Sequence, residues 1–186
     1  MRTLRRGLQN IKSSPQQHKR DEDGTIIIFS YLPMLKKWCE KIKPKTIFEY
    51  GPGESTNFFL SLPYLNKIIS VEHDKYYYNK CKSRFKDNRL ELNQVECNVN
   101  NSSYATSILN HDEKFDMIFV DGRRRVESCI SALQKASSDG CIILHDSYRE
   151  NYMKPLRPFI TPLDIDKYSL VFTPKSRNTI YKYEGE

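Results

Sequence analysis

The sequence lacks the features that mark secreted, membrane-spanning and zinc-binding proteins. Its cysteines are odd in number, widely spaced and without a CxxC pair: they are Cys39, Cys81, Cys97, Cys129 and Cys141. Neither a disulfide framework nor a zinc site is therefore expected. No apolar run approaches the roughly 20 residues that a membrane span needs, and the first residues contain no apolar block of the kind that a signal peptide requires. These absences favour a cytoplasmic protein with reduced thiols and no transmembrane segment.

Acidic residues are missing from the first 20 residues, although this segment contains six lysines and arginines. It contributes +6 to a net charge of +7, which leaves +1 for the rest of the chain. Any inference to a nucleic-acid partner therefore depends on this segment alone. We predict a basic, flexible arm over residues 1–22, for which solvation and binding to phosphate or a membrane surface are the two interpretations. Residues 23–186 are predicted to form a single domain, because the chain is long enough for one buried core and short for two.

Short apolar runs alternate with segments of helical spacing along the rest of the chain. Strands are predicted over residues 46–50, 67–71, 90–95, 115–120 and 141–144, and helices over 30–42, 55–62, 74–86, 104–109 and, in part, 150–160. A further helix is predicted from Val126 to a stop at Asp139-Gly140. Residues 168–173 and 179–183 are predicted to form a closing β-hairpin. This order indicates an α/β, three-layer Rossmann-like fold with a mostly parallel seven-stranded sheet and a terminal antiparallel hairpin.

Acids or hydrogen-bonding groups stand at the carboxyl ends of all the predicted parallel strands. These ends read Glu49-Tyr50-Gly51, Glu72-His73-Asp74, Glu96-Cys97-Asn98, Asp121-Gly122 and His145-Asp146. Capping of the next helix explains any one of them, but it explains the whole set less well. In open α/β sheets, ligands bind beyond the carboxyl ends of the strands, near the point where the strand order reverses. The sequence therefore predicts a small-molecule site at this edge of the sheet.

The first of these strands, Thr46 to Tyr50, runs into a turn that contains Gly51 and Gly53. Glycines directly after a strand let the chain turn tightly and approach a ligand without an intervening Cβ. A dinucleotide fingerprint would need a third glycine where Thr56 stands. Glu54 would also place a negative charge beside a pyrophosphate. The turn therefore favours a ligand that has no pyrophosphate.

The segment Glu49-Tyr50-Gly51-Pro52-Gly53 resembles the first motif of class I S-adenosylmethionine-dependent methyltransferases, acid-x-Gly-x-Gly, and the resemblance extends over about Thr46 to Tyr183. In that family the glycine backbone lies against the methionine part of the cofactor. An acid at the end of the second strand, here Glu72, accepts hydrogen bonds from both ribose hydroxyls, which suits a carboxylate. The loop after the third strand contacts adenine and would supply Glu96, Cys97 or Asn98. The resemblance implies a cofactor site formed by Glu49, Gly51, Gly53, Ser55, Glu72, Asn98 and Asp121.

Three residues at the ends of the last two parallel strands are candidates for catalysis. Methyl transfer from a sulfonium needs proximity, alignment and, for an alcohol acceptor, a base. His145 stands where an acceptor would lie and is the first candidate for a general base or substrate anchor. Asp146 is the second candidate, and Asp121 is the third. A structural role is the alternative for His145, because a lone histidine more often has one.

Asp121 and Asp146 also resemble two of the metal ligands in the catechol-type branch of O-methyltransferases. That branch has a further Asp or Asn beside the second ligand, where this chain has Ser147. Hard divalent cations take several oxygen ligands, so the sequence leaves open both a Mg²⁺ site at Asp121 and Asp146 and a site without metal. The lysine base of that branch would fall near Arg124, which cannot serve because arginine stays protonated.

The run Arg123-Arg124-Arg125 precedes the helix that is predicted to begin at Val126. The helix macrodipole disfavours each cation at this end by roughly 0.3–1 kcal/mol, so the run invites a functional explanation. Arginine binds carboxylate and phosphate through paired hydrogen bonds. We therefore predict that Arg123, Arg124 and Arg125, together with Tyr148, bind an anionic acceptor, and that Arg149 and Tyr152 extend the same site. Pairing of these arginines with neighbouring acids is the alternative.

Together these features predict S-adenosylmethionine-dependent methyl transfer, with an oxygen of a small molecule or saccharide as the favoured acceptor. Two alternatives stay open. The basic arm and Tyr76-Tyr77-Tyr78 would suit methylation or binding of nucleic acid, with strong salt dependence, although no Asn/Asp-Pro-Pro-aromatic motif is present. The other alternative is a non-catalytic Rossmann-like binding protein.

Overall fold

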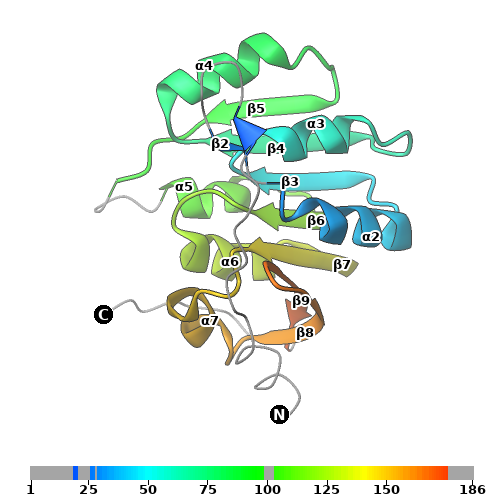
Figure 1. The fold of residues 1–186 in the computed structure, drawn as a ribbon, viewed down its shortest axis with the longest axis vertical. Coiled ribbons are helices and arrows are strands. Elements are labelled where there is room, and N and C mark those ends of the chain that lie inside the picture. The colour runs from blue at the N-terminus through cyan, green and yellow to red at the C-terminus, as the bar shows by residue number, and fades with distance from the viewer. Residues whose placement is uncertain (1–18, 21–25, 28, 99–102, 176–186) are drawn as a thin grey trace.

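A seven-stranded mixed sheet forms the centre of the protein in a computed structural model that describes residues 19–20, 26–27, 29–98 and 103–175 (Figure 1). Its strands are β3 (Thr46–Tyr50), β4 (Lys67–Glu72), β5 (Leu90–Gln94), β6 (Phe115–Val120), β7 (Ala136–His145), β8 (Ile160–Ile165) and β9 (Ser169–Pro174). They lie in the order β5-β4-β3-β6-β7-β9-β8. Strands β3 to β7 pair in parallel, whereas β9 is antiparallel to both β7 and β8. The predicted fold, a mostly parallel seven-stranded sheet with an antiparallel hairpin at one edge, is confirmed, although the strands of the hairpin differ from the predicted pair.

Helices cover both faces of the sheet. They are α2 (Leu32–Ile42), α3 (Glu54–Leu60), α4 (Lys75–Arg84), α5 (Ser103–Thr106), the 3-10 helix η1 (Ser107–Asn110), α6 (Arg125–Leu133) and α7 (Glu150–Leu156). Helices α2 and α3 share a buried core with one face, and α5, η1, α6 and α7 share a second core with the other. This is the three-layer arrangement expected from the sequence. None of the described helices combines the length and the apolar character of a membrane span.

Strand β6 shows why apolar runs locate the central strands. Its apolar side chains are all inaccessible to solvent. Successive side chains of a strand point to opposite faces, so Ile118 and Val120 enter one core, while Met117 and Phe119 enter the other. A strand between two cores has to be apolar on both faces, which is the pattern that the sequence shows here.

The strand order reverses between β3 and β6. Strand β3 pairs with β4 on one side and with β6 on the other. The chain runs outward from β3 to β4 and β5 before it returns to β6. Such a reversal opens a crevice beyond the carboxyl ends of the strands. A site is therefore expected next to Tyr50 and Val120, the last residues of β3 and β6.

Most of the predicted helices are confirmed, and one boundary is wrong. Those predicted over 30–42, 55–62 and 74–86 have ends that differ by at most two residues, the one at 104–109 is divided into α5 and the 3-10 helix η1, and the one at 150–160 ends at Leu156. The helix predicted from Val126 to Asp139-Gly140 ends at Leu133, and β7 begins at Ala136 instead of residue 141. The first residues of β7 are mostly polar, so they form no apolar run by which a strand is recognised.

Gly140 lies inside β7 instead of ending a helix. A Cβ at this position would lie 2.8 Å from the carbonyl oxygen of Phe115 and 2.9 Å from that of Asp116. The register between β6 and β7 shifts at this point, between Phe115 and Met117. Glycine in a strand often marks such a close approach of two backbones, and that is its role here.

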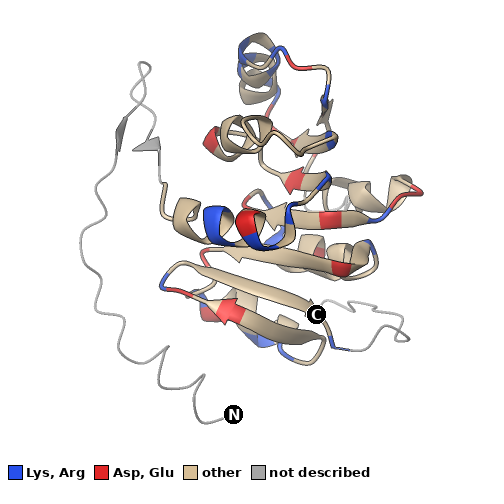
Figure 2. Ribbon diagram, turned by 90° about the vertical axis from the view of Figure 1, so that its right-hand side faces the viewer, with Lys and Arg blue, Asp and Glu red and all other residues tan. Residues whose placement is uncertain are grey.

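The terminal hairpin joins β8 to β9. Strand β9 corresponds to the predicted strand at 168–173, but its partner β8 precedes it in the chain. The predicted partner at 179–183 lies outside the described residues. So does most of the predicted arm, of which Lys19–Arg20 (β1) pair with Ile26–Ile27 (β2). On the described elements, acidic and basic residues are interspersed (Figure 2), in line with the near-neutral charge expected beyond the first 20 residues.

Candidate functional site

A cleft of about 720 Å³ opens beyond the carboxyl ends of β3, β4, β6 and β7. Its walls come from the turns after β3 and β4, from residues 121–127 and from the segment after β7. The predicted site residues that line it are Gly51, Glu72, Asp121, Arg123, Arg124, Arg125 and Asp146. Those that do not line it are Glu49, Gly53, Ser55, Asn98, His145 and Tyr148. The cleft lies where the strand order reverses, as the sequence predicts.

The floor of the cleft is a close contact between the turns after β3 and β6. Gly51 has a φ of +87°, and a Cβ there would lie 3.0 Å from both the nitrogen and the Cα of Gly122. A Cβ on Gly122 would lie 2.0 Å from the hydroxyl oxygen of Tyr104. The N–H of Asp121 donates to the carbonyl of Tyr50 at 3.1 Å and ties the two turns together. Both glycines are therefore needed for the two strand ends to meet.

Glu49 lies inside the protein next to this floor and does not reach the cleft surface. It is inaccessible to solvent, and its carboxylate accepts hydrogen bonds from the hydroxyls of Ser55 (2.5 Å), Thr56 (2.7 Å) and Ser70 (2.6 Å). The Thr56 hydroxyl also accepts a hydrogen bond from the N–H of Gly53 at 2.8 Å. Burial raises the pKa of Glu49 to about 7, and the three hydroxyl donors act in the opposite direction. Glu49 and Ser55 therefore hold the glycine turn and the start of α3 from within.

Replacing Glu49 by glutamine is expected to remove part of the pH dependence of stability. A carboxyl group whose pKa is raised by folding stabilises the folded state most at low pH, and this contribution is lost as the pH rises from about 4.5 towards about 7. One such group adds a slope of at most about 1.4 kcal/mol per pH unit. Urea unfolding of wild type and Glu49→Gln across this range measures the difference. Equal slopes in the two proteins would contradict the raised pKa.

Glu72 ends β4 with its side chain 6% exposed and one carboxylate oxygen turned back onto the chain. Oε1 accepts hydrogen bonds from the backbone N–H groups of His73 and Asp74, both at 2.7 Å, and lies 2.7 Å from Nδ1 of His73. Within the described part of the chain, Oε2 has no hydrogen-bond partner. A rigidly held carboxylate thus offers one oxygen to a ligand in the cleft.

A smaller pocket of about 290 Å³ adjoins the cleft, and the two share His73, Arg123 and Arg124. Cys97 and Asn98 complete its lining. Asn98, predicted to contact the cofactor, therefore lies here and not in the larger space. His73, which follows Glu72 in the chain, lines both spaces.

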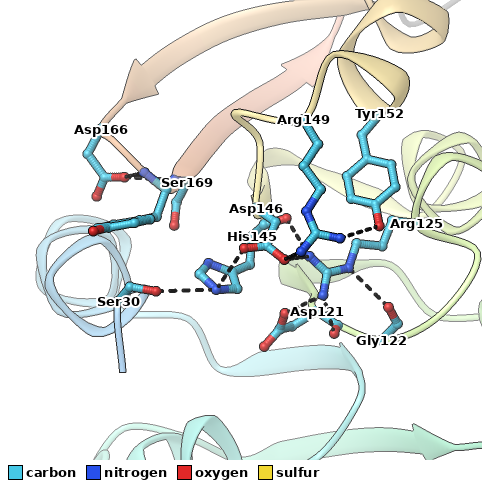
Figure 3. Close-up of polar contacts among 11 residues, drawn as sticks. Ser30, Asp121, Gly122, Arg125, His145, Asp146, Arg149, Tyr152, Asp166 and Ser169 are labelled. Carbon is cyan, nitrogen blue, oxygen red and sulfur yellow. Dashed lines mark hydrogen bonds and ion pairs between the residues drawn. The ribbon is translucent and has the colours of Figure 1, made fainter. Parts of the chain in front are cut away.

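Arg125 ties the ends of β6 and β7 together (Figure 3). Its Nε donates to the carbonyl of Gly122 at 3.0 Å, and Nη1 donates to the carbonyl of His145 at 2.8 Å and to Oδ2 of Asp146 at 2.9 Å. Nη2 donates to the carbonyl and to Oδ1 of Asp121, at 2.9 and 2.8 Å. An arginine side chain has five N–H groups, so its donors are all used. Arg125 was predicted to bind the acceptor, and the structure shows no donor left for that purpose.

Arg124 is also held by the protein. Its φ of +48° places it in the left-handed region at the start of α6. Its guanidinium donates to the carbonyl of Asn98 at 3.0 Å and pairs with Glu127 at 3.1 Å. Arg123, by contrast, is exposed at the cleft. Of the predicted arginine run, Arg123 is therefore the member that is most open to a ligand.

Arg149 and Tyr152, predicted to extend the acceptor site, line the cleft. The Arg149 guanidinium lies 3.1 Å from Oδ2 of Asp146, donates to the Tyr152 hydroxyl at 3.3 Å and is 46% exposed. The guanidinium groups of Arg125 and Arg149 lie 5.5 and 5.6 Å from the centre of the Tyr152 ring, within the range of cation–π attraction. Tyr148, predicted to bind the acceptor, is exposed and lies outside the cleft lining.

His145 is not part of the cleft wall. It lies on the side of Asp146 that faces Ser30 (Figure 3), with Nε2 3.4 Å from Oγ of Ser30 and 3.6 Å from Oδ1 of Asp146. The ring of Tyr31 packs edge-on against it at 5.2 Å, and the His145 side chain is 4% exposed. Burial lowers the pKa of His145 to about 4, so the imidazole is neutral near pH 7 and holds a proton weakly. These surroundings favour a structural role over that of a general base.

Asp121 and Asp146 both line the cleft, and Arg125 joins them. Within the described residues, Oδ2 of Asp121 has no hydrogen-bond partner. Burial raises the pKa of Asp121 to about 7, nearby Asp146 and Glu49 raise it further, and Arg125 opposes both effects. Asp146 has a φ of +58°, a conformation that costs about 1–3 kcal/mol for a residue other than glycine. The paired guanidinium groups hold it in that conformation.

These residues do not fit a divalent cation. Within the described ranges, no group of three or more His, Cys, Asp or Glu residues could hold a metal ion. Asp121 and Asp146 already bind Arg125 at 2.8 and 2.9 Å, and Asp146 also binds Arg149. Hard cations require several free oxygen ligands, and here a guanidinium occupies the place between the two carboxylates. The Mg²⁺ site that the sequence leaves open is therefore not supported.

Comparison with known proteins identifies the fold. No protein-family model matches the sequence, and no curated protein matches it. A protein from Klebsiella pneumoniae described as a candidate O-methyltransferase has a TM-score of 0.63 and 16% identity, covering 80% of this chain and 81% of that chain. The O-methyltransferase from Bacillus cereus in complex with S-adenosylhomocysteine (SAH) has a TM-score of 0.61 and 14% identity, covering 79% of this chain and 82% of that chain.

A third similar structure is the MycE methyltransferase of the mycinamycin biosynthetic pathway, in complex with Mg, SAH and mycinamycin VI. Its TM-score is 0.58 and its identity 13%, and the match covers 80% of this chain and 50% of that chain. At such low identities the likeness shows a shared fold. The chain therefore has the Rossmann-like fold of class I methyltransferases, as the sequence predicts.

Proposed function

We propose that this protein transfers a methyl group from S-adenosylmethionine to an oxygen atom of a small-molecule acceptor. The observation that carries the proposal is the carboxylate of Glu72, fixed at the end of β4, whose Oε2 has no partner among the residues that the structure describes. A carboxylate in this position suits the vicinal hydroxyls of a ribose, to which it can make charge-assisted hydrogen bonds. The O-methyltransferases that share the fold support oxygen as the atom that is methylated.

The two connected spaces supply a place for each part of such a cofactor. The ribose would bind at Glu72, and the adenine would lie in the smaller pocket beside Cys97 and Asn98. The methionine part would lie against Gly51 and near Asp121 on the cleft floor. S-adenosylmethionine supplies an activated methyl group on a cationic sulfur.

Calorimetry with SAH tests this proposal. We expect one site per chain, with a dissociation constant in the micromolar range, and no binding of a nicotinamide dinucleotide at the same concentration. Transfer from methyl-labelled S-adenosylmethionine to pools of hydroxylated small molecules, read by mass spectrometry, then tests catalysis. Failure of the folded protein to bind SAH would overturn the cofactor assignment and favour a non-catalytic binding protein. Methylation of nucleic acid, with an affinity that depends strongly on salt concentration, would instead favour a nucleic-acid methyltransferase.

We infer that the acceptor carries an anionic group. Arg125 has no free donor, and Arg124 is held by Glu127 and a backbone carbonyl. Arg149, which is 46% exposed, and Arg123 are the cations that a ligand entering the cleft would meet. Guanidinium groups match carboxylate and phosphate geometry. An acidic saccharide or a phosphorylated small molecule fits these requirements.

Replacing Arg149 by alanine is expected to weaken binding of inorganic phosphate to the SAH-loaded protein. Loss of one charge-assisted contact costs about 1.5–3 kcal/mol, which corresponds to roughly a 10- to 100-fold rise in the dissociation constant. Chemical-shift titration by NMR measures this affinity. Arg157→Ala is the matched control, because Arg149 and Arg157 flank the two ends of α7, and Arg157 pairs with Glu150 at 2.7 Å, outside the cleft lining. Equal phosphate affinity in Arg149→Ala and wild type would contradict the anionic acceptor.

Asp121 is the best-placed proton acceptor for a hydroxyl group in the cleft. Its Oδ2 is free within the described part of the structure, and its raised pKa brings it closer to the range that suits a general base at neutral pH. Asp146 is held by two arginines. His145 lies behind Asp146 and holds a proton weakly. We therefore infer that Asp121, ahead of Asp146 and His145, accepts the proton during methyl transfer.

A further inference from the structure

The guanidinium of Arg125 lies between the two carboxylates that a metal ion would need. Nη2 is 2.8 Å from Oδ1 of Asp121, and Nη1 is 2.9 Å from Oδ2 of Asp146 (Figure 3). These carboxylates stand at the ends of neighbouring strands, β6 and β7. The cation that joins them is supplied by α6, which begins with Arg125 itself.

Arg125 is held in this position by burial and by hydrogen bonds to the backbone, unlike an exposed surface cation. Its side chain is 12% exposed, and three backbone carbonyls accept hydrogen bonds from it as well as the two carboxylates. These carbonyls belong to Asp121 and Gly122, which follow β6, and to His145, which ends β7. The guanidinium is therefore hydrogen-bonded to the ends of both strands. An incoming metal ion would have to displace the Arg125 guanidinium, whose N–H groups all have acceptors. The displaced N–H groups would lose these partners inside the protein, and burying unpaired donors costs free energy.

The charge of the cluster is already balanced. Asp121 and Asp146 contribute two negative charges when ionised, and Arg125 and Arg149 contribute two positive charges. A divalent cation would therefore enter a site with no net charge to attract it. The helix macrodipole disfavours a cation at the first position of α6, and the two carboxylates offset that cost. Removal of Arg125 alone would leave a net charge of −1 and two carboxylates facing one another.

We propose that Arg125 is a resident cation that takes the place of a divalent metal between Asp121 and Asp146. It fixes the two carboxylates and the ends of β6 and β7 in position, which is the structural task a bridging metal would perform. Where the function proposed above holds, methyl transfer in this cleft requires no metal ion. A second consequence does not depend on that function: the cleft should bind divalent cations only after Arg125 has been removed.

Titration with Mn²⁺, followed by the loss of the free-ion signal in electron paramagnetic resonance, tests this second consequence. Wild type is expected to show no saturable binding at millimolar Mn²⁺. Arg125→Ala should gain one site with at least tenfold higher affinity than any binding by wild type, because one or two carboxylates with water suffice for such ions. The double variant Arg125→Ala/Asp146→Asn should lose that site. Arg123→Ala is the matched control, since it removes a cation from the same cleft without touching either carboxylate, and it should behave as wild type.

Two results would overturn the proposal. One is stoichiometric Mn²⁺ binding by wild type that Asp146→Asn abolishes, and this result decides the matter even if Arg125→Ala does not fold. The other is a folded Arg125→Ala variant, judged by circular dichroism, that gains no site. The readout involves neither cofactor nor turnover, so it separates failure of this proposal from failure of the methyltransferase assignment. An enzyme that fails to bind SAH could still behave as predicted here.

Discussion

Replacing Glu72 by alanine is expected to weaken SAH binding at least about a hundredfold, because two charge-assisted hydrogen bonds to the ribose, each worth about 1.5–3 kcal/mol, are lost together. The side chain is 6% exposed and held through Oε1, so the wild-type carboxylate is already oriented for a ligand and loses little entropy on binding. Isothermal titration calorimetry with SAH measures the effect. Asp74, the nearest carboxylate in the chain, caps α4 by accepting a hydrogen bond from the N–H of Tyr77 at 2.7 Å and does not line the cleft, so it is not expected to replace Glu72.

Two further variants separate this ligand contact from a change in the fold. Glu72→Gln keeps an oxygen that can accept hydrogen bonds but removes the charge, so its affinity is expected to lie between those of wild type and Glu72→Ala. Glu91→Ala removes an exposed carboxylate from the adjacent strand β5, where it pairs weakly with Lys67 at 3.7 Å, and it should bind SAH as wild type does. Near-normal affinity in a folded Glu72→Ala variant would contradict the ribose assignment and, with it, the basis of the proposed function.

Local patterns in the sequence predicted the parts of the fold that local physics decides. The central strands are buried on both faces, so each appears as an apolar run, as β6 shows. The end of such a run, followed by glycine, also located the cleft, because the carboxyl ends of parallel strands meet at one edge of a sheet. Gly51 and Glu72 were identified for this reason and do line the cleft. The end of α6 was misplaced because the first residues of β7 are polar.

The use made of Arg125 could not be predicted from local patterns. Two of its acceptors are a backbone carbonyl and a carboxylate at His145 and Asp146, some 20 residues further along the chain. These acceptors lie close to Arg125 only because β6 pairs with β7. Every residue has a backbone carbonyl, so the sequence does not indicate which carbonyls accept hydrogen bonds from a side chain. The run of three arginines looked uniform, yet tertiary contacts give its members different roles. Arg125 is satisfied by the protein, while Arg123 is exposed.

The hydrogen bonds around Glu49 were not predicted, although the sequence contained evidence for them. Ser70 is a polar residue inside the apolar run of β4, and a hydroxyl buried between two cores must find a hydrogen-bond partner. In the parallel pairing of β3 with β4, Ser70 is the register partner of Glu49. A serine in an otherwise apolar strand, with an acid in the strand before it, was therefore evidence that Glu49 faces the protein interior. The resemblance to a family motif instead suggested a direct contact with the cofactor.

Replacing Gly51 by alanine is expected to destabilise the protein by about 2–4 kcal/mol, because the new side chain would meet both a strained backbone and a steric contact. The φ of +87° is a conformation that residues with a Cβ rarely adopt, and that Cβ would lie 3.0 Å from the nitrogen and Cα of Gly122. Backbone atoms cannot rotate away as the end of a side chain can, so the turns after β3 and β6 must separate. Thermal unfolding should show a melting temperature lowered by roughly 5–15 °C. SAH binding should also be lost, because these two turns form the floor of the cleft.

Gly53→Ala is the control for this prediction, since it adds the same methyl group two residues later in the same turn. Gly53 has a φ of 173°, which is extended backbone open to any residue, and the Cβ would meet only the hydroxyl end of Tyr77, at 3.3 Å. Tyr77 can move by a few tenths of an ångström, so the cost is expected to stay below about 1 kcal/mol. Gly53 does not line the cleft, and SAH affinity should therefore fall by less than about tenfold. If both variants were equally destabilised, the glycine requirement would belong to the turn as a whole, and the contact between Gly51 and Gly122 would not be its cause.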